Sequence, residues 1–397
     1  MQLSQSELSV GSAATDVSLA KTASSVRAWA WRLVPPVACF VVARVFLSFI
    51  AAKSHVDGMQ AGSWARWDSA HYLSIAQRGY EFFSCARLPG YDPAEWCGTA
   101  AWMPGYPLAI RALTYTGLSL PAAGALLSAA AGVAALGLVW NAFLSAKPTL
   151  PNCLTLLLAA FFPGHIYDHA IFPVSLFIVL QLLSLHAYAR EQYAQAGLIG
   201  ALAAFTYSSG LFLAGVYGLH VLLAERRRPY SEQLRIIALT SGGVVLGFAA
   251  VLTMQRLQVG VWNAYFLVQH KYHYDPQLPF AMWIQDWKNL RDSWPHVAGL
   301  GEQRLVVLLM ATSMLFWLRW RRSPERHETL LATFLVVYWL TPLMMGGQLS
   351  LHRAEATLLP AVPLARHIPV PLLLGLLGGA LVLSKLLAKL FFISRLV

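Results

Sequence analysis

The residues best suited to chemistry lie in one short run, Arg66–Glu81. Asp68 stands directly before Ser69–Arg78, where apolar residues recur at helical spacing. Because a helix N-terminus favours an ionised carboxylate, Asp68 should stay charged. Beside His71 and aromatic rings, such a carboxylate suits a general base that takes a proton from an attacking hydroxyl. Asp68 equally suits a simple N-cap, and the spacing does not decide between these two interpretations.

The chain that carries this run has the composition of a membrane protein. Hydrophobic residues make up 57% of it and charged residues 12%, whereas soluble domains carry about 25% charged residues. Its long apolar runs are Leu33–Ala52, Ala122–Ala146, Leu154–Gly164, Ile171–Ala189, Gly197–Ala224, Ile236–Met254, Leu305–Leu318, Leu330–Met345 and Pro371–Phe392. Most approach the roughly 20 residues that a spanning helix needs. We therefore expect an all-α polytopic transmembrane protein with about nine to ten membrane helices.

The domain organisation follows from the same pattern. Residues 1–30 are polar and rich in Ser and Ala, which predicts a disordered cytoplasmic tail. Residues 31–397 then form a single transmembrane domain. No cleavable signal peptide precedes the first apolar run, so that run should remain as an anchor. The short helix after Asp68 is too polar to span and should lie in the interface, within a first outer loop over 53–118.

The positive charges predict an orientation, since Lys and Arg near helix ends mark the cytoplasm. The charges used are Lys21, Arg27, Arg32, Lys147, Arg190, Arg226, Arg227, Arg228, Arg319, Arg321, Arg322, Arg326 and Arg395. Placing all of them inside puts 53–100, 164–170, 259–300 and 347–368 outside. Residues 101–118 must then lie on or dip into the outer face, and 197–224 must enter and return as two half-helices. In a competing threading, 101–118 crosses and 197–224 is one span.

The outer segments also hold cationic side chains that could grip a phosphate. His270 and Lys271 lie in one such segment, and His352 and Arg353 in another. A guanidinium binds phosphate through two parallel hydrogen bonds, so Arg353 is the first candidate. Interfacial packing or pairing with Glu355 would explain the same residues. The net charge of +11 reflects the charge of loops, which is set by how the chain inserts into the membrane. The sequence has no array of basic and aromatic residues of the kind that binds nucleic acid.

The run Trp67–Tyr80 resembles the first-loop signature of the PIG-V family, the glycosylphosphatidylinositol mannosyltransferases and their prokaryotic relatives. Weaker matches follow in the family's order. They are Trp102–Leu108, Phe161–Pro163, Gln269–Phe280, and Arg353 with Pro360 and Pro363. The similarity runs from about residue 30 to residue 370.

Two positions depart from the family pattern. Val174 stands where the family usually has Glu, and the sequence around Tyr207 lacks the usual Arg. If those charges hold substrate, this chain uses another substrate or has lost activity. Asp168 and His169 lie close upstream of Val174 and are candidates to compensate.

The resemblance implies a GT-C-like fold. It also implies that the donor is a polyprenyl-phosphate sugar, and the sugar of the family is mannose. It points to Asp68 as the base of an inverting transfer to an acceptor hydroxyl. Fixed positive charge would stabilise the departing lipid phosphate. The substrate-binding candidates are Trp67, His71, Tyr72, Glu81, His270, Lys271, His352 and Arg353. No cofactor is implied, and the partners are membrane lipid, the lipid-linked donor and a candidate small membrane subunit.

Metal-dependent use of a nucleotide sugar fits the sequence less well. Such an enzyme would place its site in the cytoplasm and bind its metal through an Asp-x-Asp motif. The chain contains neither an Asp-x-Asp motif nor a Gly-rich phosphate loop. We therefore expect no metal.

The four cysteines fall into two pairs. Cys39 and Cys153 lie in or beside apolar runs and should behave as small hydrophobic residues. Cys85 and Cys97 lie twelve positions apart in the first outer loop, on an oxidising side. A disulfide or two free thiols would both fit, and metal binding is poorly supported because no C-x-x-C is present.

Two other function classes stay open. Half-helices near Ser208–Gly210 are a feature of transporters, although ionisable groups within the spans are few. The losses at Val174 and Tyr207 would also suit a non-catalytic scaffold. The chain has no Asn-x-Ser/Thr, which favours a bacterial plasma membrane over the ER membrane.

Overall fold

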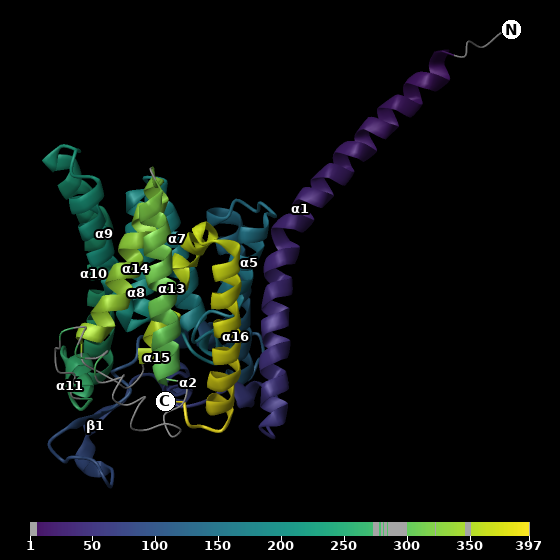
Figure 1. The fold of residues 1–397 in the computed structure, drawn as a ribbon. Coiled ribbons are helices and arrows are strands. Elements are labelled where there is room, and N and C mark those ends of the chain that lie inside the picture. Colours follow the sequence, from purple (N-terminus) through teal and green to yellow (C-terminus); the bar gives the residue numbers. More distant parts are fainter. Residues whose placement is uncertain are drawn as a thin grey trace.

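The protein is a bundle of helices with one small sheet (Figure 1). The computed structural model describes residues 6–272, 278, 281, 284, 300–321, 323–345 and 351–396. In the described part, the only strands are β1 (Phe82–Ser84) and β2 (Trp96–Gly98), which pair antiparallel. The fold is therefore all-α, as the composition predicts.

Four described helical segments are long and apolar enough to cross a membrane. They are Trp29–Lys53 in α1 (Ser6–Lys53), Leu120–Phe143 in α4 (Leu120–Leu138) with η3 (Val139–Phe143), α10 (Tyr230–Val259) and α16 (Val370–Phe392). Shorter apolar helices pack among them, namely α5 (Leu150–Ala160), α7 (Val174–Ala189), α8 (Tyr193–Thr206) and α9 (Phe212–Ala224). These segments identify a membrane protein.

The first helix is long. Helix α1 starts at Ser6 and continues without a break through Pro35 and Pro36 to Lys53, and the disordered cytoplasmic tail over 1–30 stays a prediction. The N-terminal half of α1 extends away from the bundle (Figure 1).

The two ends of the bundle differ in chemistry. We call the end that carries Arg32, Lys147, Arg190 and Arg321 the basic end, and the opposite end, which carries Asp68 and the β1–β2 hairpin, the loop end. At the basic end, the indole of Trp140 donates to the carbonyl of Trp31 at 2.7 Å. Gly132 faces Phe40 midway along, so α1 and α4 run antiparallel.

This antiparallel pairing decides how residues 101–118 run. Lys53 ends α1 at the loop end, and Leu120 begins α4 at the same end. The chain between them therefore does not cross the bundle. Its helix α3 (Gly105–Thr114) packs along the loop-end half of α4, where the hydroxyl of Tyr106 donates to the carbonyl of Gly124 at 3.1 Å. The preferred threading of this segment agrees with the structure.

Helices α8 and α9 form a hairpin, as that threading also requires. Glu191, just before α8, pairs with Arg228, just after α9, at 2.7 Å, so both ends lie at the basic end. The turn is η4 (Ser208–Leu211), in which Gly210 lies against the backbone of Ala204. A side chain at Gly210 would collide there, and this explains the glycine.

The C-terminal region corrects the predicted topology. Residues 347–368 were expected on one side, but η5 (Leu359–His367) is buried over most of its length and returns the chain to the basic end. There Arg366 donates to the carbonyl of Phe143 at 2.8 Å. Helix α16 then runs back, since Phe392 packs against Trp64. Arg395 thus lies at the loop end, opposite to the expectation.

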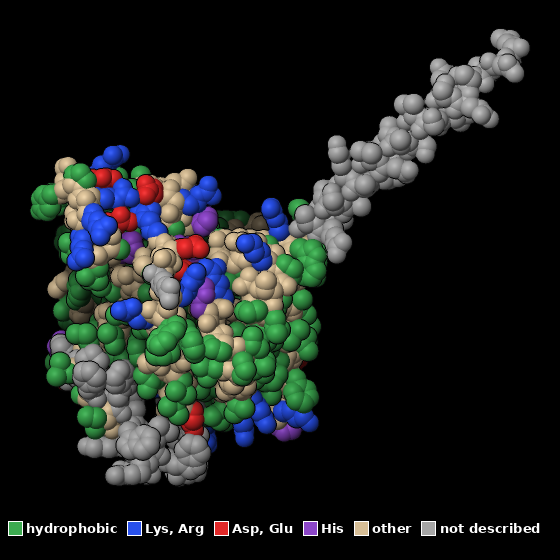
Figure 2. Space-filling model, turned by 45° about the horizontal axis from the view of Figure 1, so that its top comes forward, with side chains coloured by type: hydrophobic (Ala, Val, Ile, Leu, Met, Phe, Trp, Pro, Cys, Tyr) green, Lys and Arg blue, Asp and Glu red, His purple; other side chains and the backbone are tan. Residues whose placement is uncertain are grey.

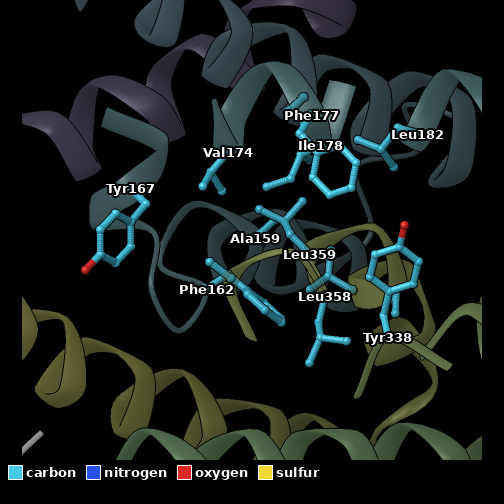
Figure 3. Close-up of a cluster of buried hydrophobic side chains, with 14 of the residues drawn as sticks. Ala159, Phe162, Tyr167, Val174, Phe177, Ile178, Leu182, Tyr338, Leu358 and Leu359 are labelled. Atoms are coloured by element: carbon cyan, nitrogen blue, oxygen red, sulfur yellow. The ribbon is translucent and has the colours of Figure 1, made fainter. Parts of the chain in front are cut away.

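The centre of the core is built from side chains of several short helices (Figure 3). Val174, Phe177 and Leu359 are each almost fully buried there. Residues 164–170, which include α6 (Ile166–His169), were expected in an outer turn but are buried as well. Because Val174 is fully buried, a charged side chain at this position would be costly unless it were paired.

Candidate functional site

Asp68 is placed by a strained turn at the start of α2 (Ser69–Arg78). The preceding residue, Trp67, has a φ of 48°, which lies in the left-handed region and is costly for a large side chain. The carboxylate makes no capping hydrogen bond to α2. It accepts instead from the guanidinium of Arg353, 285 positions further along the chain. A simple N-cap role therefore does not account for Asp68.

Arg353 lies on the short helix α15 (Leu351–Ala356) and closes over Asp68. Its side chain is 10% exposed and that of Asp68 is 24% exposed. Its guanidinium also lies 5.7 Å from the ring centre of Phe172. Burial, the largest single cause, lowers the pKa of Arg353, but Asp68 together with Tyr207 and Tyr167 outweighs it and raises the pKa above its usual value. The arginine is thus a permanent cation whose counter-ion remains partly open to solvent.

Tyrosines surround this ion pair. Tyr72 on α2 is buried and packs edge-on against Tyr106 and Phe172. Burial, followed by the nearby Tyr207 and Asp68, raises the pKa of Tyr72 well above its usual value. Tyr72 is therefore a neutral hydroxyl beside the pair.

Tyr207 is the site residue that sequence reasoning did not propose. It stands in extended backbone between α8 and η4, and its electrostatic influence reaches Arg353 and Tyr72. The sequence marked this position only as a departure from the pattern of the family that the chain resembles, and that departure was the available signal.

His71 flanks the pair on the other side. Its ring stacks on that of Trp102 with centroids 3.7 Å apart. Burial is the main cause that lowers the pKa of His71. The charge of Asp68 opposes this shift, the charge of Lys271 adds to it, and the charge of Glu81 opposes it more weakly. His71 is therefore neutral near pH 7 and able to give or accept a hydrogen bond.

His352 precedes Arg353 on α15 and is held by a buried contact. It is buried and shares a 2.7 Å hydrogen bond with the hydroxyl of Tyr167. Burial, together with the charge of Arg353, lowers its pKa well below the usual value. His352 therefore carries no charge, and its geometry fits positioning of α15 better than gripping a phosphate.

The remaining candidates lie further out. Trp67 is 42% exposed, and Glu81 pairs with Arg78 on the surface at 3.2 Å. His270, at the end of α11 (Ala264–His270), contacts Glu95 at 3.2 Å and not the central pair. Lys271 lies against the β1–β2 hairpin, and burial lowers its pKa.

That hairpin contains a disulfide between Cys85 and Cys97, while Cys39 and Cys153 are free. The bond joins the ends of a loop that begins with η2 (Cys85–Arg87) and projects from the loop end, as seen beside β1 in Figure 1. Phe82 and Trp96 stack across the two strands at 4.5 Å. The hairpin is thereby a stiff rim that brings Glu95 to His270.

Asp168 and His169, the candidates to compensate for the departures at Val174 and Tyr207, lie away from Asp68. Both are buried against α1 and α4, where the backbone carbonyl of His169 accepts from Arg44 at 3.2 Å. The residues described by the structure contain no group of three or more His, Cys, Asp or Glu able to hold a metal.

The fold and site define a helical membrane protein with a partly open Asp–Arg pair, ringed by tyrosines, at the end opposite its cationic loops. No family model matches the sequence, and neither does any curated protein.

Proposed function

We propose that the protein is a GT-C type membrane glycosyltransferase that acts at the loop end. It transfers a sugar, mannose by the resemblance, from a polyprenyl-phosphate donor to an acceptor hydroxyl. The contact between Asp68 and Arg353 carries this proposal, because it unites a base and a phosphate-binding cation from opposite ends of the sequence. The absence of Asn-x-Ser/Thr supports a bacterial plasma membrane as the location.

The chemistry needs one proton acceptor and one stabilised leaving group. Asp68 takes the proton of the acceptor hydroxyl as its oxygen attacks the anomeric carbon. The bond from that carbon to the phosphate oxygen breaks, and its electron pair stays on the lipid phosphate. Arg353 holds the resulting charge through its planar fork. Attack opposite the leaving group inverts the anomeric configuration.

The ion pair also suggests an order of events. With Arg353 bound to it, the Asp68 carboxylate has one oxygen occupied by the guanidinium. A donor phosphate that draws the guanidinium away frees this oxygen to accept the proton of the acceptor hydroxyl. Donor binding thus precedes activation of the acceptor.

The test is Asp68→Asn in membranes supplied with labelled polyprenyl-phosphate sugar. The asparagine oxygen can still accept from Arg353, so the fold should be kept while transfer is lost. Asp92→Asn is the matched control, since this exposed carboxylate only caps a turn by accepting from the nitrogen of Ala94. Full transfer by Asp68→Asn, or equal loss in Asp92→Asn, would exclude the base assignment.

Transport is less well supported. The cavity lined by Asp168, His169 and mostly apolar residues has a volume of about 10 Å³, enough for about one water. A solute pathway would need more space. A non-catalytic scaffold remains the alternative, and it predicts that Asp68→Asn changes nothing but stability.

A further inference from the structure

A second polar site lies at the basic end, away from Asp68 and Arg353. It is an open cavity of about 650 Å³, within the range typical of small-molecule sites. The face that contains it carries dense blue and purple side chains in Figure 2. Its cationic and histidine lining is Lys147, His186, Arg190, Arg321, Arg326, His327, Arg366 and His367, with Glu325 as the carboxylate. We call this cavity the basic pocket.

The floor of the basic pocket is fixed by one buried carboxylate. Glu328 is 1% exposed and accepts from Arg321 and Arg366, each at 2.7 Å. His367 approaches the same oxygen at 2.6 Å. Two permanent cations thus share one anion, so the floor keeps an excess of positive charge. The arginines are held in place before any ligand arrives, which lowers the entropic cost of binding.

The walls differ in how well their charges are matched. Arg326 is neutralised by Glu225 at 2.6 Å and Glu191 at 3.2 Å. Within the described part of the chain, neither Lys147 nor Arg190 has an ion-pair partner, and both side chains are exposed. These two cations are the ones available to a ligand.

We infer that the basic pocket binds a phosphate-bearing anion. Positive charge at this end also follows from insertion topology, but topology requires only charge near helix ends and not a cavity with prearranged arginines. A phosphate offers several acceptor oxygens that match two lysine or arginine groups and a guanidinium floor. The ligand reaches the pocket either as a soluble phosphate or diphosphate or as the headgroup of an anionic lipid. This site is independent of the proposed sugar transfer.

The experiment uses the full chain in phosphatidylcholine nanodiscs titrated with inorganic pyrophosphate. Lys147→Gln/Arg190→Gln should weaken binding by about tenfold or more, since each charge-assisted contact contributes about 1.5–3 kcal/mol. Arg226→Gln/Arg227→Gln is the matched control. It removes the same charge at the same end, from exposed arginines that do not line the pocket.

A second arm replaces part of the phosphatidylcholine by phosphatidic acid and measures the thermal unfolding midpoint without pyrophosphate. Pyrophosphate binding identifies a soluble ligand, and stabilisation by phosphatidic acid alone identifies a lipid headgroup. Either result supports the inference if Lys147→Gln/Arg190→Gln abolishes it and the control keeps it. No effect in both arms, or equal losses in the control, overturns it. Asp68→Asn should bind normally, which separates this test from that of sugar transfer.

Discussion

The fork of Arg353, and not its charge alone, should matter at the residue scale. Arg353→Lys keeps a cation near Asp68 but loses the paired donors that fit a phosphate. One lost charge-assisted hydrogen bond costs about 1.5–3 kcal/mol, so sugar transfer should fall by roughly tenfold or more. Donor-dependent rates in membranes measure this.

Arg78→Lys is the control for that substitution. Arg78 is exposed at the end of α2 and pairs with Glu81 just beyond that helix, so its replacement should leave transfer unchanged. Wild-type rates in Arg353→Lys would show that Arg353 is only a counter-ion for Asp68.

The sequence could name Asp68 and Arg353 but not their contact. Both stood out by residue type, yet a separation of 285 positions hides a contact that only packing creates. His270 was a candidate to bind phosphate because it is one of the cationic residues of an outer segment. In the structure it contacts Glu95, which lies in the loop that the disulfide closes. The spacing of residues predicts neighbours along the sequence, but it does not predict contacts between distant segments in the folded structure.

At the scale of elements, the β1–β2 hairpin should depend on its disulfide. Without reduction, denatured protein should show only the thiols of Cys39 and Cys153, and after reduction all four cysteines should react. Closing a loop of this order contributes about 3 kcal/mol in the chain-entropy model. Cys85→Ser/Cys97→Ser should therefore be cut faster by trypsin after Arg87.

Cleavage after Arg227 is the internal control, since that exposed loop lies at the other end of the bundle. Equal thiol labelling before and after reduction would count against the disulfide. Unchanged cleavage after Arg87 would show that strand pairing alone holds the hairpin.

The α8–α9 turn should not tolerate a side chain at Gly210. A Cβ there would lie 2.5 Å from the Cα of Ala204, which is backbone and cannot move aside. Overpacking of this kind costs about 1–3 kcal/mol, so Gly210→Ala should lower the unfolding midpoint. Gly242→Ala on α10 meets nothing within 4 Å and should be neutral or stabilising. Similar midpoints for both variants would mean that the turn is looser than this packing requires.

The type of each secondary-structure element was easier to predict from the sequence than its path through the bundle. Ser69–Arg78 is a helix as its periodicity indicates, and the half-helices break at Ser208–Gly210 as expected. Helix η5, which contains Pro360 and Pro363, was missed because the threading by positive charges assigned 347–368 to one outer segment. A 3-10 helix accommodates these prolines while burial in the core supplies the stabilisation that propensity does not.

At the scale of the whole molecule, charge predicts which helix ends lie together, with one failure. Arg190 and Arg228 meet at the basic end through Glu191, as insertion topology implies. Arg395 was assigned to that end only because it is cationic, and the buried crossing of η5 places it at the other. Counting charges at helix ends cannot reveal that η5 crosses the bundle, because the sequence of η5 does not look like that of a membrane helix.

Surface labelling in cells tests this arrangement as a whole. In a Cys39→Ser/Cys153→Ser background, Gln192→Cys and Arg227→Cys should react from the same side of the membrane, because both ends of the α8–α9 hairpin lie at the basic end. Met59→Cys and Tyr115→Cys, both exposed, should react from the opposite side. An impermeant thiol reagent, applied before and after permeabilisation, makes the distinction.

The competing threading gives the reverse pattern. If 101–118 crossed and 197–224 were one span, Met59→Cys and Tyr115→Cys would report different sides, and so would Gln192→Cys and Arg227→Cys. The native disulfide does not interfere, since Cys85 and Cys97 carry no free thiol. If Met59→Cys reacts from outside the cell, Asp68 and Arg353 face the side where a polyprenyl-phosphate sugar donor of the GT-C type is used. If it reacts only after permeabilisation, the proposed sugar transfer fails while the basic pocket turns outward.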